Sequence, residues 1–321
     1  MAVVAPSQGL ANFARLERGL AALRSMRWIP IVADSASREI DGIAASAERR
    51  AAELEAAFLD DEVEAVFTIY GGYNTNELLP LIDWSIFAKH PKILCGYSDT
   101  TTLLLAAFAR CGVCTFHGPA VLPELGDPDG VEPYTRASLK AIMEGFEGSL
   151  PLASAESWHD EHRCWGTPAE TRRPQRQAGG WRWLRGGDVR GVLVGGHLES
   201  MEVMVGTGFL PSLEGRVLFW DAFETDDRRF RRSVTHLRQA GVLDDVAGVV
   251  LGRMARTPAE AVRRIETWLP SQFAENVPIV TGVDLGHTDP MLTLPIGGVV
   301  ELASARDAIV ISESTVERGH S

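Results

Sequence analysis

The sequence lacks the long apolar run that a membrane-spanning helix needs. None of its 321 residues fall in a stretch of 18 consecutive apolar positions, whereas a membrane span takes about 20. The first residues also lack a basic segment followed by an apolar core of signal-peptide length. Positive charge is scarce, because 31 Lys and Arg stand against 43 Asp and Glu, for a net charge of −12. Such a surface repels a phosphate backbone. We therefore expect a cytoplasmic protein without a nucleic-acid or membrane partner.

Cysteine is also scarce, and the four residues are too unevenly spread for a disulfide scaffold: Cys95, Cys111, Cys114 and Cys164. Cys111 and Cys114 form a C-x-x-C pair, but no second Cys/His pair at zinc spacing accompanies it. We therefore interpret them as structural thiols rather than as a redox motif or half a zinc site. His159 and His162 have H-x-x-H spacing without a third ligand in register, which favours a polar loop. No metal or organic cofactor is expected.

The composition, 45% hydrophobic and 23% charged, is typical of globular chains, and the length suggests about two domains. Residues 1–122 alternate β-branched runs with helical stretches, which predicts βαβ units and a doubly wound parallel α/β domain. The expected strands are Met1–Ala5, Trp28–Ala33, Ala65–Tyr70, Ile93–Cys95 and Val113–Phe116. The expected helices are Asn12–Ser25, Ala44–Phe58 and Thr100–Cys111.

Residues 123–188 are rich in Pro, Gly, Arg and Trp, which predicts a linker with a long loop that has no regular structure of its own. Such loops are often functional, and the aromatic side chains here indicate binding. The tryptophans are Trp158, Trp165, Trp181 and Trp183.

Residues 189–321 predict a second, mixed α/β domain. Its expected strands are Gly191–Val194, Arg216–Trp220, Ala247–Leu251 and Pro278–Thr281, and its expected helices are Arg228–Gln239 and Ala259–Gln272. The run MLTLPIGGVVELASARDAIVIS closes the domain, and its Gly297-Gly298 pair predicts the turn of a hairpin.

Ser98 is the candidate nucleophile. Within PKILCGYSDTTTLLLAAFARCG it follows an apolar strand and precedes an amphipathic helix. A serine at such a strand-to-helix elbow exposes its hydroxyl above the helix N-terminus. The G-x-S-x-G pattern is half met, because Thr100 replaces the second glycine. The alternative is that Ser98 or Asp99 only caps the helix.

A nucleophilic serine needs a base and a carboxylate that orients it. His287 is the candidate base, because it follows the apolar run VPIVTGVDL in a turn bounded by glycine and proline. Active sites of open α/β sheets collect at such strand ends. Asp221 and Glu224 follow another strand, RVLFW, and both are candidate acids. Alternatively, they are first-turn acids favoured by a helix dipole.

An oxyanion site is predicted where the strand AVFTIY ends in Gly71-Gly72-Tyr73-Asn74. Glycines allow close backbone approach, so the amide of Gly72, together with that of Asp99, is positioned to stabilise an oxyanion. An ordinary βα turn is the alternative. Gly71 and Asn74 are expected to contact substrate.

These pieces together resemble the LD-carboxypeptidase family of serine peptidases, which includes muramoyl-tetrapeptide carboxypeptidases and microcin C immunity peptidases. The resemblance covers nearly the whole chain, from VVAPS through TFHGPAV, GVLVGGHLESM and VLFWDAFE to GHTDPMLTLPIG. It implies an N-terminal domain similar to class I glutamine amidotransferases, a C-terminal domain with a small β-barrel, and a homodimer. It also implies a Ser-Glu-His triad, whose serine falls on Ser98 and whose histidine falls on His287.

Two positions depart from the family pattern. The acid position falls on Asp221, whose carboxylate is one methylene shorter than that of glutamate, so Glu224 is kept as the fallback acid. His197 stands in GGHLES, where relatives more often have asparagine, and it is expected to lie in the wall of the substrate site.

The resemblance is closer to the microcin C immunity branch, which implies cleavage of a peptidyl or aminoacyl nucleotide conjugate. Trp181 and Trp183 in GGWRWLRGG would then stack on a nucleobase, with ordinary strand packing as the alternative. Nearby arginines either bind a phosphate or carboxylate, or form a solvated surface: Arg172, Arg173, Arg176, Arg182 and Arg185. Two other functions stay open, an L,D-carboxypeptidase of peptidoglycan recycling and a weakly catalytic module that binds a peptide-nucleotide.

Overall fold

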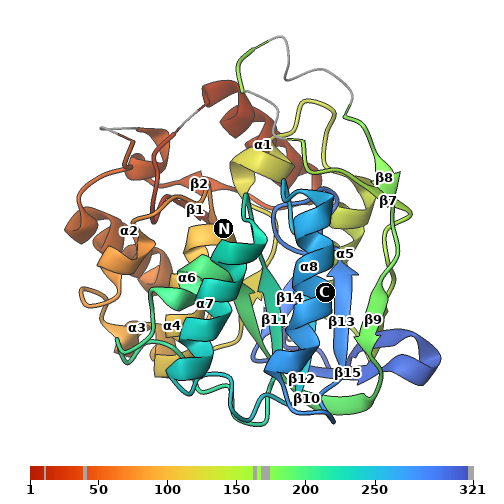
Figure 1. The fold of residues 1–321 in the computed structure, drawn as a ribbon. Helices are drawn as coiled ribbons and strands as arrows, with labels where there is room; N and C mark the ends of the chain where they lie inside the picture. Colours follow the sequence, from red (N-terminus) through yellow and green to blue (C-terminus); the bar gives the residue numbers. More distant parts are fainter. Residues whose placement is uncertain (11, 39–41, 162–164, 168–173, 317–321) are drawn as a thin grey trace.

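The computed structural model describes all residues except 11, 39–41, 162–164, 168–173 and 317–321. It is a mixed α/β fold built on two sheets (Figure 1). The first sheet has the order β14-β5-β4-β3-β1-β2, in which every strand is parallel to its neighbours except β14. Its strands are β1 (Ala2–Val4), β2 (Ile31–Val32), β3 (Ala65–Thr68), β4 (Ile93–Gly96), β5 (Thr115–His117) and β14 (Leu294–Ile296).

Alternation along these short strands sends neighbouring side chains to opposite faces of the sheet. Val3 joins an apolar cluster with α1, whereas Val4 joins another with α2 and α4. Both α1 and α2 begin at a residue whose side chain accepts a main-chain N–H, as N-caps do: Asn12 from Arg15 and Ser46 from Arg49. The helices of this part are α1 (Phe13–Ser25), α2 (Ala47–Leu59), α3 (Trp84–Lys89) and α4 (Thr101–Cys111).

The second sheet has the order β6-β16-β15-β10-β11-β12-β13-β9. Strands β10 to β13 are parallel, and the outer strands pair antiparallel. The strands are β6 (Leu150–Leu152), β9 (Arg182–Arg185), β10 (Asp188–His197), β11 (Val217–Asp221), β12 (Gly248–Gly252), β13 (Ile279–Val283), β15 (Val299–Ala303) and β16 (Ala308–Ile311). In Figure 1, α7 (Asp227–Gln239) and α8 (Ala259–Trp268) cover β11 to β13, and α6 (Leu198–Glu202) follows β10.

Two expectations from the sequence are wrong. Strands β14 and β15 do not form a hairpin at Gly297-Gly298, because β14 pairs with β5 in the first sheet and β15 pairs with β10 in the second. The described parts of residues 123–188 are not an irregular loop, since they contain α5 (Pro133–Met143), β6, the small pair β7 (Ser157–Trp158) and β8 (Gln177–Ala178), and β9. The domain boundaries, the doubly wound description and the small barrel stay predictions.

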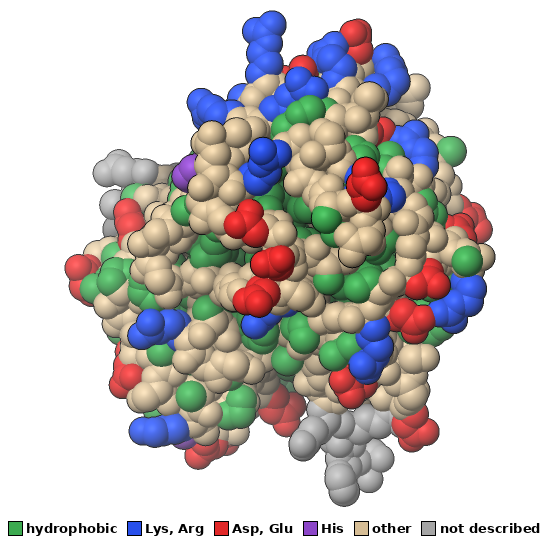
Figure 2. Space-filling model, turned by 60° about the horizontal axis from the view of Figure 1, so that its bottom comes forward, with side chains coloured by type: hydrophobic (Ala, Val, Ile, Leu, Met, Phe, Trp, Pro, Cys, Tyr) green, Lys and Arg blue, Asp and Glu red, His purple; other side chains and the backbone are tan. Residues whose placement is uncertain are grey.

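Charged side chains of both signs are spread over the face shown in Figure 2, with a group of basic ones at its upper edge. Across the described parts of the chain, no helix is both long and apolar enough to cross a membrane.

Candidate active site

Ser98 lies at the elbow that its sequence predicts. Strand β4 ends at Gly96, and Ser98 follows with a backbone φ of +60°, in the left-handed region that L residues seldom adopt. A short 3-10 turn (Ser98–Thr100) then leads into α4. Strain of this kind persists only where the surroundings hold the residue firmly. The turn presents the Ser98 side chain above the N-terminal end of α4.

Ser98, His287 and Asp221 come together from three separate parts of the chain. His287 Nε2 lies 3.0 Å from Ser98 Oγ, and His287 Nδ1 lies 2.5 Å from Asp221 Oδ2. Asp221 ends β11 and is fully buried, whereas His287 belongs to the loop after β13. All three residues follow or end parallel strands at their carboxyl ends, the edge where α/β folds place their sites.

The surroundings of this trio hold the His287 ring in place and keep Asp221 ionised. The Phe223 ring stacks on the His287 ring at 4.5 Å, and the Tyr97 ring meets it edge-on at 5.0 Å. Burial by itself would raise the pKa of Asp221, but the charge and hydrogen bond of His287 outweigh it and hold the pKa far below its usual range. Asp221 is therefore ionised at neutral pH and favours a proton on Nδ1 of His287.

Two further histidines stand behind the trio. His117 is fully buried, and burial lowers its pKa to about 4 despite the opposing charge of Asp221. Burial also lowers the pKa of His197, whose Nδ1 lies 3.0 Å from Ser200 Oγ and whose ring centre is 5.2 Å from that of His287. His197 thus lies beside His287, and it lines the cavity described below.

The glycine loop after β3 lies directly against Ser98. A Cβ on Gly71 would come within 2.9 Å of Ser98 Cβ and 3.0 Å of its Oγ. Gly72 has a φ of +150°, and both glycines line the cavity described below. Asn74 lies in the same loop but is not among the cavity-lining residues, and its side-chain amide donates to Glu77 at 3.1 Å.

The Asp99 side chain, which the sequence suggested only as a possible helix cap, anchors this glycine loop. Its buried Oδ2 accepts hydrogen bonds from Ser7 Oγ (2.6 Å), Thr75 N (2.9 Å) and Thr75 Oγ1 (2.7 Å). Ser7 Oγ also accepts from Asn74 N at 3.1 Å. Asp99, the residue after Ser98, is thus bound through its side chain to the opposite wall of the cavity.

A cavity of about 380 Å³ opens over Ser98 and His287. Its lining is rich in carboxylates: Glu124, Asp127, Asp160, Glu161, Glu199, Glu224 and Asp289. The only lining Lys or Arg side chains within the described ranges are Arg15 and Arg256, and each faces one of these acids, Asp127 at 3.4 Å and Glu224 at 2.6 Å.

The two candidate acids have different partners. Glu224 lines the cavity with a φ of +46°, and its carboxylate contacts Arg256 rather than His287. Asp221 is the acid that contacts His287.

Trp181 and Trp183 lie away from the cavity. Trp181 Nε1 donates to Asp284 at 3.0 Å, and Trp183 Nε1 donates to Asp307 at 2.8 Å. Each side chain is half-buried against the core. Trp183 lies in the edge strand β9 and Trp181 directly precedes it, and both pack against the core, which favours the alternative of ordinary strand packing.

The nearby arginines are likewise engaged within the fold. Arg176 pairs with Glu132 at 2.6 Å, Arg182 with Glu266, and Arg185 donates to main-chain carbonyls. Arg172 and Arg173 lie outside the described residues, as do His162 and Cys164.

Among the aromatic side chains that line the cavity, Tyr70 and Trp165 lie side by side. Their rings lie 5.0 Å apart, and the Arg15 guanidinium stands 4.7 Å from the Trp165 ring centre. Glu124 lies nearby, accepts hydrogen bonds from Tyr97 Oη (2.7 Å) and Ala120 N (2.9 Å), and has its pKa raised by burial to about 8. Trp165 is one of the four tryptophans of residues 123–188 that the sequence analysis names, but no local pattern distinguishes it from the other three.

Among the residues that the structure describes, two groups of side chains each bring three metal-ligand atoms within 4.8 Å of one another. One is His197, Asp221 and His287, of which Asp221 and His287 already contact each other in the trio above. The other is Glu132, His159 and Asp289, in which Glu132 is paired with Arg176.

Family models match two long segments of the chain. Residues 1–118 match the LD-carboxypeptidase N-terminal domain, and residues 190–302 match the LD-carboxypeptidase C-terminal domain. The chain belongs to the LD-carboxypeptidase family. The family assignment confirms the resemblance seen in the sequence and makes the protein a serine peptidase.

Curated relatives carry both of the names that the sequence suggested. A putative carboxypeptidase of Treponema pallidum is 32% identical, over 85% of this chain and 80% of its own. A probable murein peptide carboxypeptidase of Bacillus subtilis is 30% identical (86% and 80%), and the microcin C7 self-immunity protein MccF of Escherichia coli is 29% identical (78% and 74%). The structure of MccF in complex with aspartyl sulfamoyl adenosine superposes with a TM-score of 0.91 at 25% identity, covering 98% of this chain and 96% of that one.

Proposed function

We propose that this LD-carboxypeptidase family member hydrolyses an amide through Ser98, His287 and Asp221. The observation that carries the proposal is the continuous contact from Ser98 Oγ through the imidazole to Asp221 Oδ2, at 3.0 and 2.5 Å. His287 takes the proton of Ser98 as the hydroxyl attacks the carbonyl carbon, and then gives it to the leaving amine. Water attacks the acyl-enzyme by the same route and releases the acid.

The amides of Gly72 and Asp99 stabilise the oxyanion of this reaction. Supporting this, the Gly71 backbone approaches both Ser98 and the Asp99 amide, since a Cβ on Gly71 would be 3.6 Å from Asp99 N. The Asp99 carboxylate holds the glycine loop in that place. Preorganised donors of this kind need no rearrangement as charge develops on the oxygen.

The proposed substrate is a peptidyl or aminoacyl nucleotide conjugate, cleaved at the amide that joins the amino-acid carboxyl to the nucleotide-like part. Two observations support this choice. The cavity over Ser98 presents the rings of Tyr70 and Trp165, and a nucleobase stacks on such a surface with about 1–3 kcal/mol per base. The MccF relative binds aspartyl sulfamoyl adenosine.

A second candidate function is favoured by charge. Within the described residues, seven acidic side chains and two arginines line the cavity. Burial raises the pKa of Glu124 to about 8, but the other six acids still outnumber the arginines, an excess that attracts an amine and repels a phosphate. A muropeptide with an amino group near its scissile L,D amide fits this charge better than a nucleotide does. The corresponding activity is that of a muramoyl-tetrapeptide L,D-carboxypeptidase.

Product analysis by mass spectrometry separates the two functions. Wild type and Ser98→Ala are incubated with aspartyl sulfamoyl adenosine and, separately, with a muropeptide tetrapeptide. Release of aspartate and sulfamoyl adenosine by wild type alone supports the first function, and release of terminal D-alanine supports the second. If wild type cleaves neither but both proteins bind the conjugate, the chain is a binding module and the catalytic proposal is wrong.

Substitution of single tryptophans tests the nucleotide assignment. Trp165→Ala is expected to raise KM for the conjugate roughly 5- to 150-fold, the equivalent of one lost stack. Trp183→Ala is the matched control, because Trp183 is also half-buried but lies outside the cavity. An unchanged KM in Trp165→Ala refutes nucleobase stacking on this residue.

The homodimer that the family resemblance implies is also proposed, and light scattering at assay concentration tests it.

A further inference from the structure

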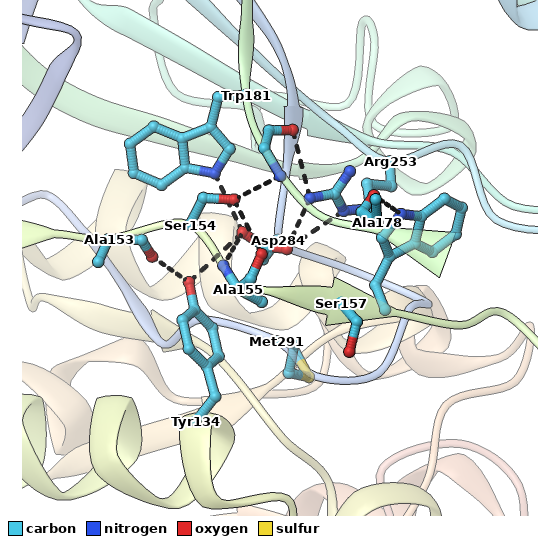
Figure 3. Close-up of polar contacts among 12 residues, drawn as sticks. Tyr134, Ala153, Ser154, Ala155, Ser157, Ala178, Trp181, Arg253, Asp284 and Met291 are labelled. Carbon is cyan, nitrogen blue, oxygen red and sulfur yellow. Dashed lines mark hydrogen bonds and ion pairs between the residues drawn. The ribbon is translucent and has the colours of Figure 1, made fainter. Parts of the chain in front are cut away.

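Asp284 is a fully buried carboxylate three residues before His287. Its Oδ1 accepts two hydrogen bonds from Arg253, from Nε at 3.1 Å and from Nη2 at 2.9 Å. Its Oδ2 accepts from Trp181 Nε1 at 3.0 Å and from Ala155 N at 3.1 Å (Figure 3). None of these atoms belongs to the site described above, yet a buried carboxylate with this many donors is held in one position.

The donors come from segments that are far apart in the sequence. Arg253 follows β12, Ala155 follows β6, and Trp181 precedes β9. The Tyr134 hydroxyl of α5 donates to the Ala153 carbonyl at 2.5 Å and lies 3.4 Å from Asp284 Oδ2 (Figure 3). One side chain thus joins α5, the residues around β7 and β8, and the carboxyl end of the central strands.

This anchor lies at the base of the loop that carries His287. Leu292 N donates to the Asp284 carbonyl at 2.6 Å, which closes residues 284–292 into a loop. Within it, Gly286 (φ +83°) lies so close to the triad acid that a Cβ there would be 2.3 Å from Asp221 Cβ. A shift of Asp284 would therefore move the backbone that sets the distance between His287 and Asp221.

The segment that holds Asp284 also holds the far side of the loop. His159 and Asp289 exchange two main-chain hydrogen bonds of 2.9 Å each, His159 N to Asp289 O and Asp289 N to His159 O. His159 and Asp289 both line the cavity. Residues 155–159 thus hydrogen-bond to the His287 loop at two points, Asp284 before His287 and Asp289 after it.

From this geometry we propose that Asp284 is a positioning residue, which fixes the loop of His287 and thereby the alignment of the imidazole between Ser98 and Asp221. The proposal rests on the proposed role of His287 as the base. Replacing Asp284 by Asn keeps the size but places an NH₂ group against donors and leaves Arg253 without its carboxylate. The loop then relaxes, and misplacement of a catalytic group by about 1 Å lowers the rate roughly 100-fold.

The test is covalent labelling of Ser98 by a fluorophosphonate, followed by intact mass. The maximal labelling rate and the half-saturating probe concentration are measured separately in Asp284→Asn. We expect the maximal rate to fall at least about tenfold and the half-saturating concentration to stay within about twofold, because probe contacts in the cavity are untouched. A residue with only a structural role would change the melting temperature without changing the rate per folded molecule.

Glu266→Gln is the matched control. Glu266 is also a buried acid, is paired with Arg182 of β9 and accepts from Thr281 of β13 at 3.0 Å, but it does not contact the His287 loop. Its maximal labelling rate per folded molecule is expected to equal that of wild type at one common temperature at which both proteins are folded. The proposal is overturned if Asp284→Asn labels as fast as wild type. It is also overturned if Glu266→Gln loses as much of its maximal rate as Asp284→Asn does.

Trp181→Phe covers the case in which Asp284→Asn does not fold. It keeps a ring in place and removes only the indole N–H that Asp284 accepts, so a several-fold loss of maximal rate is expected and an unchanged rate overturns the proposal. Failure of wild type to label at Ser98 is a different result. It refutes the proposed function itself, and the positioning role falls with it.

Discussion

Gly71→Ala tests the placement of the glycine loop most directly. The added Cβ would lie 2.9 Å from Ser98 Cβ and 3.0 Å from Ser98 Oγ, whereas carbon atoms pack at about 3.5–4.0 Å. Either the loop or the nucleophile must move by roughly 0.5–1 Å. Because Gly71 is not in the left-handed region, the backbone itself tolerates alanine, and the effect should fall on Ser98 rather than on folding.

A displacement of that size is expected to lower kcat about 100-fold, which is about 2.7 kcal/mol in the barrier. The assay is the rate of product release from saturating substrate, with a thermal melt to confirm folding. Gly186→Ala is the matched control, since its Cβ would also lie 3.0 Å from a serine Oγ, that of Ser304, outside the cavity. A folded Gly71→Ala protein with wild-type kcat, or an equal loss in Gly186→Ala, would refute the reasoning.

Three further predictions concern the acids of the site. Asp221→Asn is expected to lower kcat about 10⁴-fold, since an amide stabilises the wrong imidazole tautomer, and Glu224→Gln far less; the reverse order in a turnover assay would make Glu224 the acid. Glu124 has a folded pKa of about 8, above the unfolded value of 4.5, so the folded state binds more protons between those values and stability falls as pH rises through that window. Between pH 6 and pH 8.5, the melting temperature of Glu124→Gln should therefore fall by less than that of wild type. Equal falls in the two proteins would contradict this. Ser7→Ala removes a donor to the Asp99 carboxylate and is expected to cost about 1–3 kcal/mol in urea unfolding, with a loss of kcat that a change confined to stability would not produce.

The sequence by itself determined the local parts of the site. Ser98 could be found because an elbow is encoded by neighbouring residues, an apolar strand on one side and an amphipathic helix on the other. His287 and Asp221 could be found for the same reason, since both stand at the ends of strands with clear apolar runs. Most strands and helices of residues 1–122 follow from periodicity, and their bounds agree to within a few residues, although β2 is shorter than expected.

Only the tertiary structure decided which of these local candidates meet. Asp221 rather than Glu224 contacts His287 because β11 continues through Asp221, in register with His197 of β10, while the chain then turns Glu224 toward Arg256. The separation of β14 and β15 into different sheets, the cavity position of Trp165 and the burial of Asp284 depend likewise on partners that are distant in the sequence. Trp181 and Ala155, for example, lie 103 and 129 residues from Asp284. Local sequence propensity cannot predict such partners, because strand pairing and burial depend on how the whole chain packs.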